Sequence, residues 1–127
     1  MLREISSGSV KILSIQRDEL LRALEGISQQ IQRAHREVKE IWLFGSVARG
    51  DQVGTSDVDI LIVVYGAGPA DRLNAALDFA SYFALPVGVD LLVMGEMQVE
   101  KRLTEGDPFV RRIYQEGRPL GGGKAGK

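Results

Sequence analysis

The pattern of apolar and polar residues along the chain predicts an alternation of helices and strands. In residues 16–37, apolar side chains recur every three or four positions, which is typical of a helix with one buried face. Gly26 lies inside this stretch and lowers its helix propensity. The residues on the predicted buried face are Leu20, Leu21, Leu24, Ile27, Ile31 and Ala34.

Three apolar runs predict the strands of a sheet, at residues 38–44, 58–65 and 87–94. The middle run, VDILIVVY, is dense in β-branched residues and indicates a buried strand. Residues 8–15 alternate only weakly, and they form either a short strand or an extended arm.

Shorter helices are predicted between and after these strands. We expect a helical turn at 47–50, a helix at 70–83 and a weaker helix at 97–103. Asp107 followed by Pro108 is typical of a helix N-cap and first position. The side chains of the second and last helices that are expected to face the core are Leu73, Leu77, Ala80, Phe83, Phe109, Ile113 and Tyr114.

These elements predict a single domain of the α/β (α+β) class in residues 1–120. Its parts are an N-terminal helical arm (1–37), a core with the main strands (38–94) and a C-terminal helical segment (97–120). The glycine-rich end, 121–127, is expected to be a flexible tail. A length of 127 residues suits one domain, and 44% hydrophobic with 26% charged residues is an ordinary globular balance.

The composition argues against several kinds of site. The chain has no cysteine, which excludes disulfides, thiolate zinc sites and a cysteine nucleophile. Its single histidine, His35, argues against a histidine metal site and a Ser-His-Asp triad, and we expect it at the surface or at a helix cap. No apolar run approaches the roughly 20 residues that span a bilayer, and the first ten residues lack the apolar segment of a signal peptide. We therefore expect a soluble, cytoplasmic protein.

The formal net charge is −1, but the charges are unevenly distributed. Residues 41–98 contain two basic and seven acidic groups, whereas 1–40 and 99–127 are each net positive. The central acids are either a solvated face or a cation site, because clustered carboxylates repel one another unless a metal or a partner neutralises them. An overall basic surface for nucleic acid is absent.

A Gly45-Ser46 pair stands where the first predicted strand ends. Glycine lets the backbone turn sharply and approach a ligand closely. A serine hydroxyl and the N–H groups of a following helical turn suit a phosphate oxygen. Such pairs are mostly structural, so this interpretation depends on the residues that follow.

Asp57 and Asp59 stand at the head of the most apolar strand. Residues two apart point to the same face, and two close carboxylates destabilise each other unless a cation lies between them. Mg²⁺ prefers such hard oxygen ligands. The acids could instead cap the preceding turn, which explains Asp57 better than Asp59 because aspartate is depleted within strands.

Asp90 interrupts the next apolar strand in the same way, as VDLLVM. Neighbouring strands lie about 4.8 Å apart, so this carboxylate is predicted to face the first pair. An aspartate within an apolar strand costs folding free energy unless its charge has a partner, so two such strands suggest a shared partner. The sequence therefore predicts a three-carboxylate site at one edge of a small sheet.

The segments LFGSVARGD and SDVDILIVV, with the later strand aspartate, resemble the polymerase-β nucleotidyltransferase superfamily. Within it, they resemble the minimal nucleotidyltransferases (MNT) and their MntA-like antitoxin group. The resemblance covers residues 38–93 closely, and RRIYQEGRPL resembles the closing helix and last short strand of that group. It implies a polymerase-β-like fold, with a small mixed β-sheet and helices packed on one side.

The resemblance also implies roles for the residues of the turn. Gly45 and Ser46 match the positions that hold the β- and γ-phosphates of a nucleotide. Arg49 matches a basic residue that contacts phosphate, and its alternative is an ion pair with Asp51 or another acid.

The three aspartates match the metal-binding positions of that superfamily. Asp57 and Asp59 match the pair that binds two Mg²⁺ ions. Asp90 matches the third carboxylate, which shares one ion and helps to activate the attacking hydroxyl.

The implied function is a Mg²⁺-dependent nucleotidyltransferase that moves a nucleoside monophosphate, expected to be AMP from ATP, to a hydroxyl acceptor. MNT proteins commonly pair with a HEPN-domain toxin, so the chain is expected to be the antitoxin that modifies such a partner. The alternatives are a non-catalytic antitoxin that neutralises its partner by forming a complex, and transfer to a small molecule such as an aminoglycoside. Nucleic acid is not expected as a direct substrate. The oligomeric state is left open between a single chain, a homo-oligomer and a hetero-oligomer.

Overall fold

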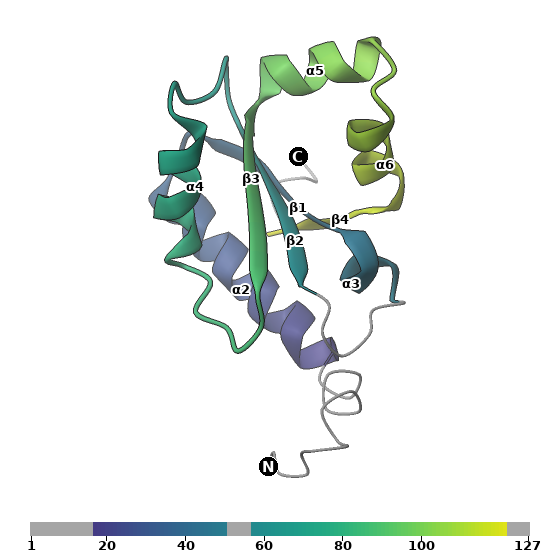
Figure 1. Ribbon diagram of the computed structural model, residues 1–127. Helices are drawn as coiled ribbons and strands as arrows, with labels where there is room; N and C mark the ends of the chain where they lie inside the picture. The colour runs from purple at the N-terminus through teal and green to yellow at the C-terminus, as the bar shows by residue number, and fades with distance from the viewer. Residues whose placement is uncertain (1–16, 51–56, 122–127) are drawn as a thin grey trace.

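The computed structural model describes residues 17–50 and 57–121, and these residues form five helices and four strands (Figure 1). The predicted strand or arm at 8–15 lies outside the described residues. Along the chain the elements are α2 (Arg17–Ala34), β1 (Val38–Phe44), α3 (Gly45–Arg49), β2 (Val58–Val64), α4 (Arg72–Ala80), β3 (Val89–Gly95), α5 (Glu96–Thr104), α6 (Pro108–Glu116) and β4 (Arg118–Leu120).

The strands form one mixed sheet in the order β3-β2-β1-β4. β1 pairs antiparallel with β2 and with β4, whereas β2 pairs parallel with β3. The parallel pair is connected through α4, because parallel neighbours need a crossover connection. The predicted α/β (α+β) fold with a small mixed sheet is confirmed, and so are the three main strands and the short final strand.

Helices cover both faces of the sheet. α2 and α4 pack on one face, in an apolar cluster that includes Val58, Ile60 and Ile62. α5 and α6 pack on the other face, in a second cluster that includes Leu61 and Val63 (Figure 1). The expectation that the helices pack on one side is therefore wrong. The reason is that β2 is apolar at successive positions, so it presents apolar side chains to both faces, and each face must be covered.

The long predicted helix is α2, and it ends at Ala34, which is exposed. Ser28 joins its buried face, although it is polar. The other predicted core positions of this helix are buried or partly buried: Leu20, Leu21, Leu24, Ile27 and Ile31.

α4 turns a different face to the core than the one predicted. Leu73 and Leu77 are 72% and 61% exposed, and Ala80 is also exposed, whereas Phe79 is buried. Of the predicted residues, only Phe83 is buried. An aromatic ring removes more apolar area from water than a leucine does, so burial of Phe79 sets the rotation of this short helix about its axis.

α6 begins as predicted, because the Asp107 side chain accepts a hydrogen bond of 3.1 Å from the Phe109 N–H. Ile113 is buried, as expected. Phe109 is 48% exposed, and the fully buried neighbour is Val110. The prediction that Phe109 faces the core is therefore wrong, which leaves its ring open to the surface beside β1.

Gly121 belongs to the folded part of the chain. Its N–H donates a hydrogen bond of 2.8 Å to Glu25 Oε1 on α2, and the residue is buried. The predicted flexible tail at 121–127 is thus wrong for its first residue, and the remainder of that tail lies outside the described residues.

Glu40 links β1 to α6 beneath the second apolar cluster. Its Oε1 atom accepts hydrogen bonds from Tyr114 Oη at 2.7 Å and from Trp42 Nε1 at 3.0 Å. Burial and the neighbouring carboxylate raise the pKa of the Tyr114 hydroxyl, which therefore stays protonated as a donor. Tyr114 is partly buried, as predicted, and its ring lies 4.6 Å from that of Trp42.

Replacement of Glu40 by alanine is expected to lower the free energy of unfolding by about 1–3 kcal/mol, because two partly buried donors lose their acceptor. Urea denaturation measures this change. The control is Glu105→Ala, which removes an exposed ion pair of 3.8 Å with Lys101 and is expected to cost less than about 0.5 kcal/mol. Equal losses in the two variants would contradict this role of Glu40.

Candidate active site

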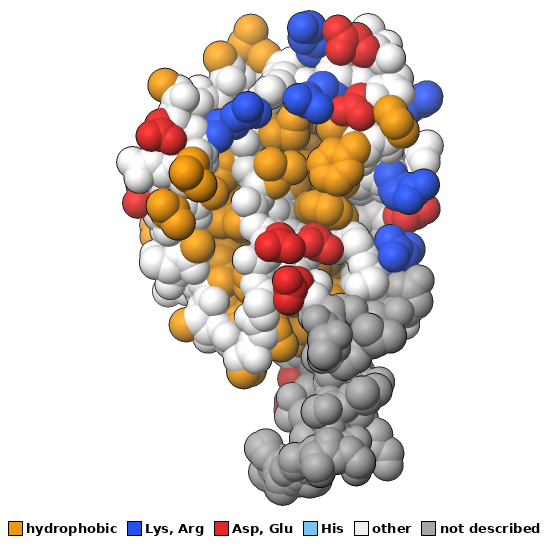
Figure 2. All heavy atoms as spheres, viewed as in Figure 1, with side chains coloured by type: hydrophobic (Ala, Val, Ile, Leu, Met, Phe, Trp, Pro, Cys, Tyr) orange, Lys and Arg blue, Asp and Glu red, His pale blue; other side chains and the backbone are white. Residues whose placement is uncertain are grey.

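The ends of three strands meet at one edge of the sheet. Phe44, the last residue of β1, is the register partner of Asp59 in β2, and Asp59 is the register partner of Asp90 in β3. Asp57 directly precedes β2. Figure 2 shows acidic side chains gathered on the front face, beside an apolar area. The register thus brings Asp59 and Asp90 to facing positions on adjacent strands.

Asp59 lies in an electrostatically unfavourable environment. Its pKa is raised above the ordinary aspartate value, first because partial burial disfavours the charged form, and then because Asp90 and Asp57 repel that charge. The positive charge of Arg49 has the opposite effect. These four side chains therefore interact electrostatically, and a cation among the acids would relieve their repulsion.

The turn after β1 is fitted closely against Asp59. Gly45 has a φ of 80°, in the left-handed region that favours glycine. A Cβ atom at this position would overlap Oδ2 of Asp59. Since Gly45 and Ser46 are also the first residues of α3, the Gly-Ser pair and the strand carboxylate belong to one site.

Hydrogen bonds from α2 fix the position of α3. Arg17 donates hydrogen bonds to the carbonyl oxygens of Val47, at 2.8 and 3.2 Å, and of Ala48, at 3.3 Å. These carbonyls lie near the C-terminal end of α3, where a positive charge is favourable. α3 starts two residues earlier than the turn predicted at 47–50. Sequence reasoning missed Arg17, because it lies 30 residues from Val47 and no local pattern marks the contact.

Gly88 is a second glycine that fits against a site carboxylate. A Cβ atom there would lie 2.5 Å from Asp57 Oδ1. Its carbonyl oxygen also accepts a hydrogen bond of 2.9 Å from the Val58 N–H. Sequence reasoning missed this residue, because a glycine shortly before a strand is compatible with many folds and Asp57 lies 31 residues away.

Arg49 lies between the turn and α6. Its Nη1 atom is 3.7 Å from Glu116 Oε1, which is an ion pair of the kind that was expected as the alternative to phosphate contact. Asp51, the other acid considered, lies outside the described residues. Because Arg49 also acts electrostatically on Asp59, it stays close enough to the site for phosphate contact to remain our prediction.

Within residues 17–50 and 57–121, no group of three or more acidic or histidine side chains is arranged to hold a metal ion. The donor chemistry nevertheless fits a divalent cation. Carboxylate oxygens are the ligands that Mg²⁺ prefers, and burial, followed by repulsion from Asp90 and Asp57, already raises the pKa of Asp59.

His35 is not part of this site. Its Nδ1 atom is 3.1 Å from Glu37 Oε2 and its Nε2 atom is 3.0 Å from Tyr82 Oη. Its ring also packs edge-on against Phe79, in the cluster between α2 and α4. His35 therefore connects the end of α2 to the segment after α4, and its role is structural.

None of the helices in the described part of the chain is both long enough and apolar enough to cross a membrane.

Comparisons with known proteins agree with this geometry. A protein from Methanocaldococcus jannaschii, named by inference as a protein adenylyltransferase, is 38% identical over 85 residues, which cover 65% of this chain and 78% of that protein. A crystal structure of an inferred nucleotidyltransferase from Sulfolobus solfataricus superposes with a TM-score of 0.57 at 26% identity, covering 69% of this chain and 78% of that one. A crystal structure of a toxin–antitoxin with AMP-PNP superposes with a TM-score of 0.53 at 26% identity, covering 76% and 71%.

The sequence profile of the nucleotidyltransferase domain family matches residues 24–120. This range contains all the strands and all the aspartates of the candidate site. The chain therefore belongs to the nucleotidyltransferase domain family and is a nucleotidyltransferase.

Proposed function

We propose that the protein transfers AMP from ATP to a hydroxyl group of a partner protein, with Mg²⁺ as cofactor. The observation that carries this proposal is that Asp59 faces Asp90 across the β2–β3 pair and abuts Gly45. Acids for a metal thus lie beside a turn suited to phosphate. Two findings support ATP as the donor. One relative is named as a protein adenylyltransferase, and one structural neighbour was crystallised with AMP-PNP.

In this proposal each side chain has a stated role. Gly45, Ser46 and Arg49 bind the β- and γ-phosphates of ATP. The carboxylates of Asp57, Asp59 and Asp90 would hold two Mg²⁺ ions. Bound Mg²⁺ supplies charge neutralisation on the attacking and leaving oxygens.

The transfer itself is an in-line displacement. The acceptor hydroxyl oxygen forms a bond to the α-phosphorus of ATP, the bond from that phosphorus to the bridging oxygen breaks, and pyrophosphate leaves. Asp90 lies on the edge strand of the sheet. Its carboxylate orients the acceptor hydroxyl and accepts the proton that this hydroxyl loses. No covalent enzyme intermediate is needed, which agrees with a chain that has no cysteine and only one histidine.

We propose a HEPN-domain toxin as the partner and an antitoxin role for this chain, in the cytoplasm. The support is the resemblance to the MNT group and the toxin–antitoxin neighbour. The division into one domain at 1–120 is part of the same proposal. Neutralisation of the partner by complex formation alone is the second candidate, and it predicts that catalytic variants still protect.

Replacement of Asp57 by alanine is expected to abolish labelling of the partner when purified protein, Mg²⁺, α-labelled ATP and the partner are combined. The physical reason is the loss of one of the carboxylates around the cation. The measurement is the mass of the partner, which should increase by one AMP with the wild-type chain. Asp78→Ala, which removes an exposed acid of α4, is the control and should label normally. Full labelling by Asp57→Ala would remove Asp57 from the mechanism, and full protection without labelling would favour the binding-only alternative.

A further inference from the structure

α6 lies directly beside the Gly-Ser turn. A hollow of about 60 Å³ separates them, and Gly45, Arg49, Phe109 and Arg112 are among the residues that line it. Arg112 is exposed, and among the described residues no carboxylate forms an ion pair with it. Arg49 of α3 and Arg112 of α6 thus line a hollow beside the turn to which we assign the phosphates, together with Glu116, which forms an ion pair with Arg49.

A larger hollow of about 420 Å³ follows β3 between α4, α5 and α6. Its wall is apolar along Leu91, Leu92 and Met94, and this agrees with the apolar area beside the acidic side chains in Figure 2. Leu92 is two residues beyond Asp90 and so points to the same face of the sheet. The wall of the hollow therefore includes a side chain on the same face of β3 as Asp90.

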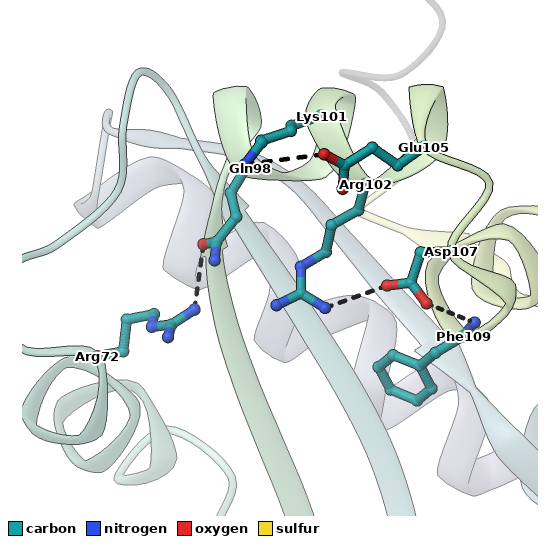
Figure 3. Close-up of polar contacts among 7 residues, drawn as sticks. All are labelled: Arg72, Gln98, Lys101, Arg102, Glu105, Asp107 and Phe109. Carbon is teal, nitrogen blue, oxygen red and sulfur yellow. Dashed lines mark hydrogen bonds and ion pairs between the residues drawn. The ribbon is translucent and has the colours of Figure 1, made fainter.

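The rim of the larger hollow carries two arginines that neighbouring side chains hold in place (Figure 3). Arg102 Nη1 donates to Asp107 Oδ2 at 3.1 Å, and Arg72 Nη1 donates to Gln98 Oε1 at 3.1 Å. An apolar wall with a few positioned donors is the composition of a small-molecule site, and the volume suits a nucleoside.

Phe109 lies between the two hollows and lines both of them. Its ring is 48% exposed, although it contacts Phe44 in an edge-on arrangement with ring centres 5.7 Å apart. Phe44 is the residue before Gly45 and the register partner of Asp59. The exposed ring is therefore anchored to the strand end that carries the site.

We propose that α6 is the nucleotide-binding wall of this enzyme: Arg112 contacts the terminal phosphates, and the Phe109 ring stacks on the nucleobase in the larger hollow. Phe109 and Arg112 are three residues apart, so they lie on the same side of the helix. A guanidinium suits a phosphate, and an open aromatic ring suits a base. This inference rests on the proposed function in that the ligand is a nucleoside triphosphate.

The test is calorimetric titration of the full chain with ATP and with inorganic tripolyphosphate, both in Mg²⁺ and without acceptor. Phe109→Ala is expected to weaken ATP binding about tenfold, the loss of one stacking contact, and to leave tripolyphosphate binding unchanged. Arg112→Gln is expected to weaken both ligands about tenfold. Arg111→Gln, which removes the adjacent exposed arginine of α6, is the matched control and should change neither.

Phe109→Tyr keeps an aromatic ring and should keep the affinity for ATP. This variant shows whether a loss of affinity in Phe109→Ala comes from loss of the ring or from any substitution at this position. Wild-type ATP affinity in Phe109→Ala, with a raised KM for the acceptor, would show that the larger hollow binds the acceptor and would overturn the proposal. Equal behaviour of Arg112→Gln and Arg111→Gln would also overturn it. Failure of the wild-type chain to bind either ligand would instead count against the proposed function.

Discussion

Replacement of Asp59 by asparagine is expected to abolish nucleotidyl transfer and, at the same time, to raise the free energy of unfolding at neutral pH. Transfer fails because an amide of the same shape cannot neutralise the charge of a divalent cation. Metal-assisted charge stabilisation contributes several kcal/mol to such reactions, so the rate should fall by about 10³-fold or more. The measurement is pyrophosphate release at saturating ATP and acceptor.

The gain in stability follows from the raised pKa of the same carboxyl group. Burial, Asp90 and Asp57 all disfavour its charge, so the folded chain retains this proton at pH values where the unfolded chain has released it. Stability therefore falls as the pH rises from the ordinary aspartate pKa to the raised one, and the cost persists above that range. Asparagine carries no such charge, and urea denaturation of the two proteins in EDTA should show the difference.

Asp78→Asn is the control for both measurements, because this exposed acid on α4 lies outside the site. It should leave the rate and the stability close to those of the wild type. An Asp59→Asn variant with half of the wild-type rate would exclude Asp59 as a metal ligand. A variant that is inactive and also strongly destabilised would show instead that the carboxylate supports the fold.

The opposite effects expected for activity and stability explain why part of this site could be predicted from sequence. An aspartate inside an apolar strand, such as Asp59 or Asp90, contradicts the local preference for β-branched and aromatic residues. Such a contradiction is conspicuous in a single sequence. The side-chain alternation of a strand then predicts which face these residues share, and the register of β2 with β3 places them opposite each other.

Arg17 and Gly88 could not be recognised in the same way. Arg17 acts by donating to carbonyls of α3, and Gly88 by leaving room for the Asp57 side chain. Both contacts depend on how distant segments meet in three dimensions. An arginine at a helix start and a glycine before a strand are each compatible with many folds, so the sequence contains no local signal for these roles.

The rotation of a short helix about its axis depends on packing and is not determined by the periodicity of its sequence. In α4, Leu73 and Leu77 follow helical spacing but are exposed, whereas Phe79 is buried, and Phe83, which lies just after the helix, is buried as well. In α6, Val110 rather than Phe109 enters the core. The periodicity predicted that these segments are helices, but packing against the sheet decides which side is buried.

Replacement of Gly45 by alanine is expected to reduce transfer by about 10²-fold or more and to lower the free energy of unfolding by about 1–3 kcal/mol. Two physical effects act together. The φ of 80° is unfavourable for any residue with a Cβ atom, and that atom would also overlap the Asp59 carboxylate. Either the turn or Asp59 must move, and both belong to the proposed site. Steady-state rates and urea denaturation measure the two effects.

Two other glycines separate backbone strain from crowding at the site. Gly66 has a φ of 78°, and a Cβ atom added there would have no other atom within 4 Å, so Gly66→Ala should lose stability and keep its activity. Gly26 lies inside α2 with open space around it, so Gly26→Ala should gain up to about 1 kcal/mol of stability. If Gly45→Ala retains as much activity as Gly66→Ala, contact between the turn and Asp59 is not required for transfer. If only Gly45→Ala loses activity, the loss comes from displacement of the turn or the carboxylate, because Gly66→Ala experiences the same backbone strain.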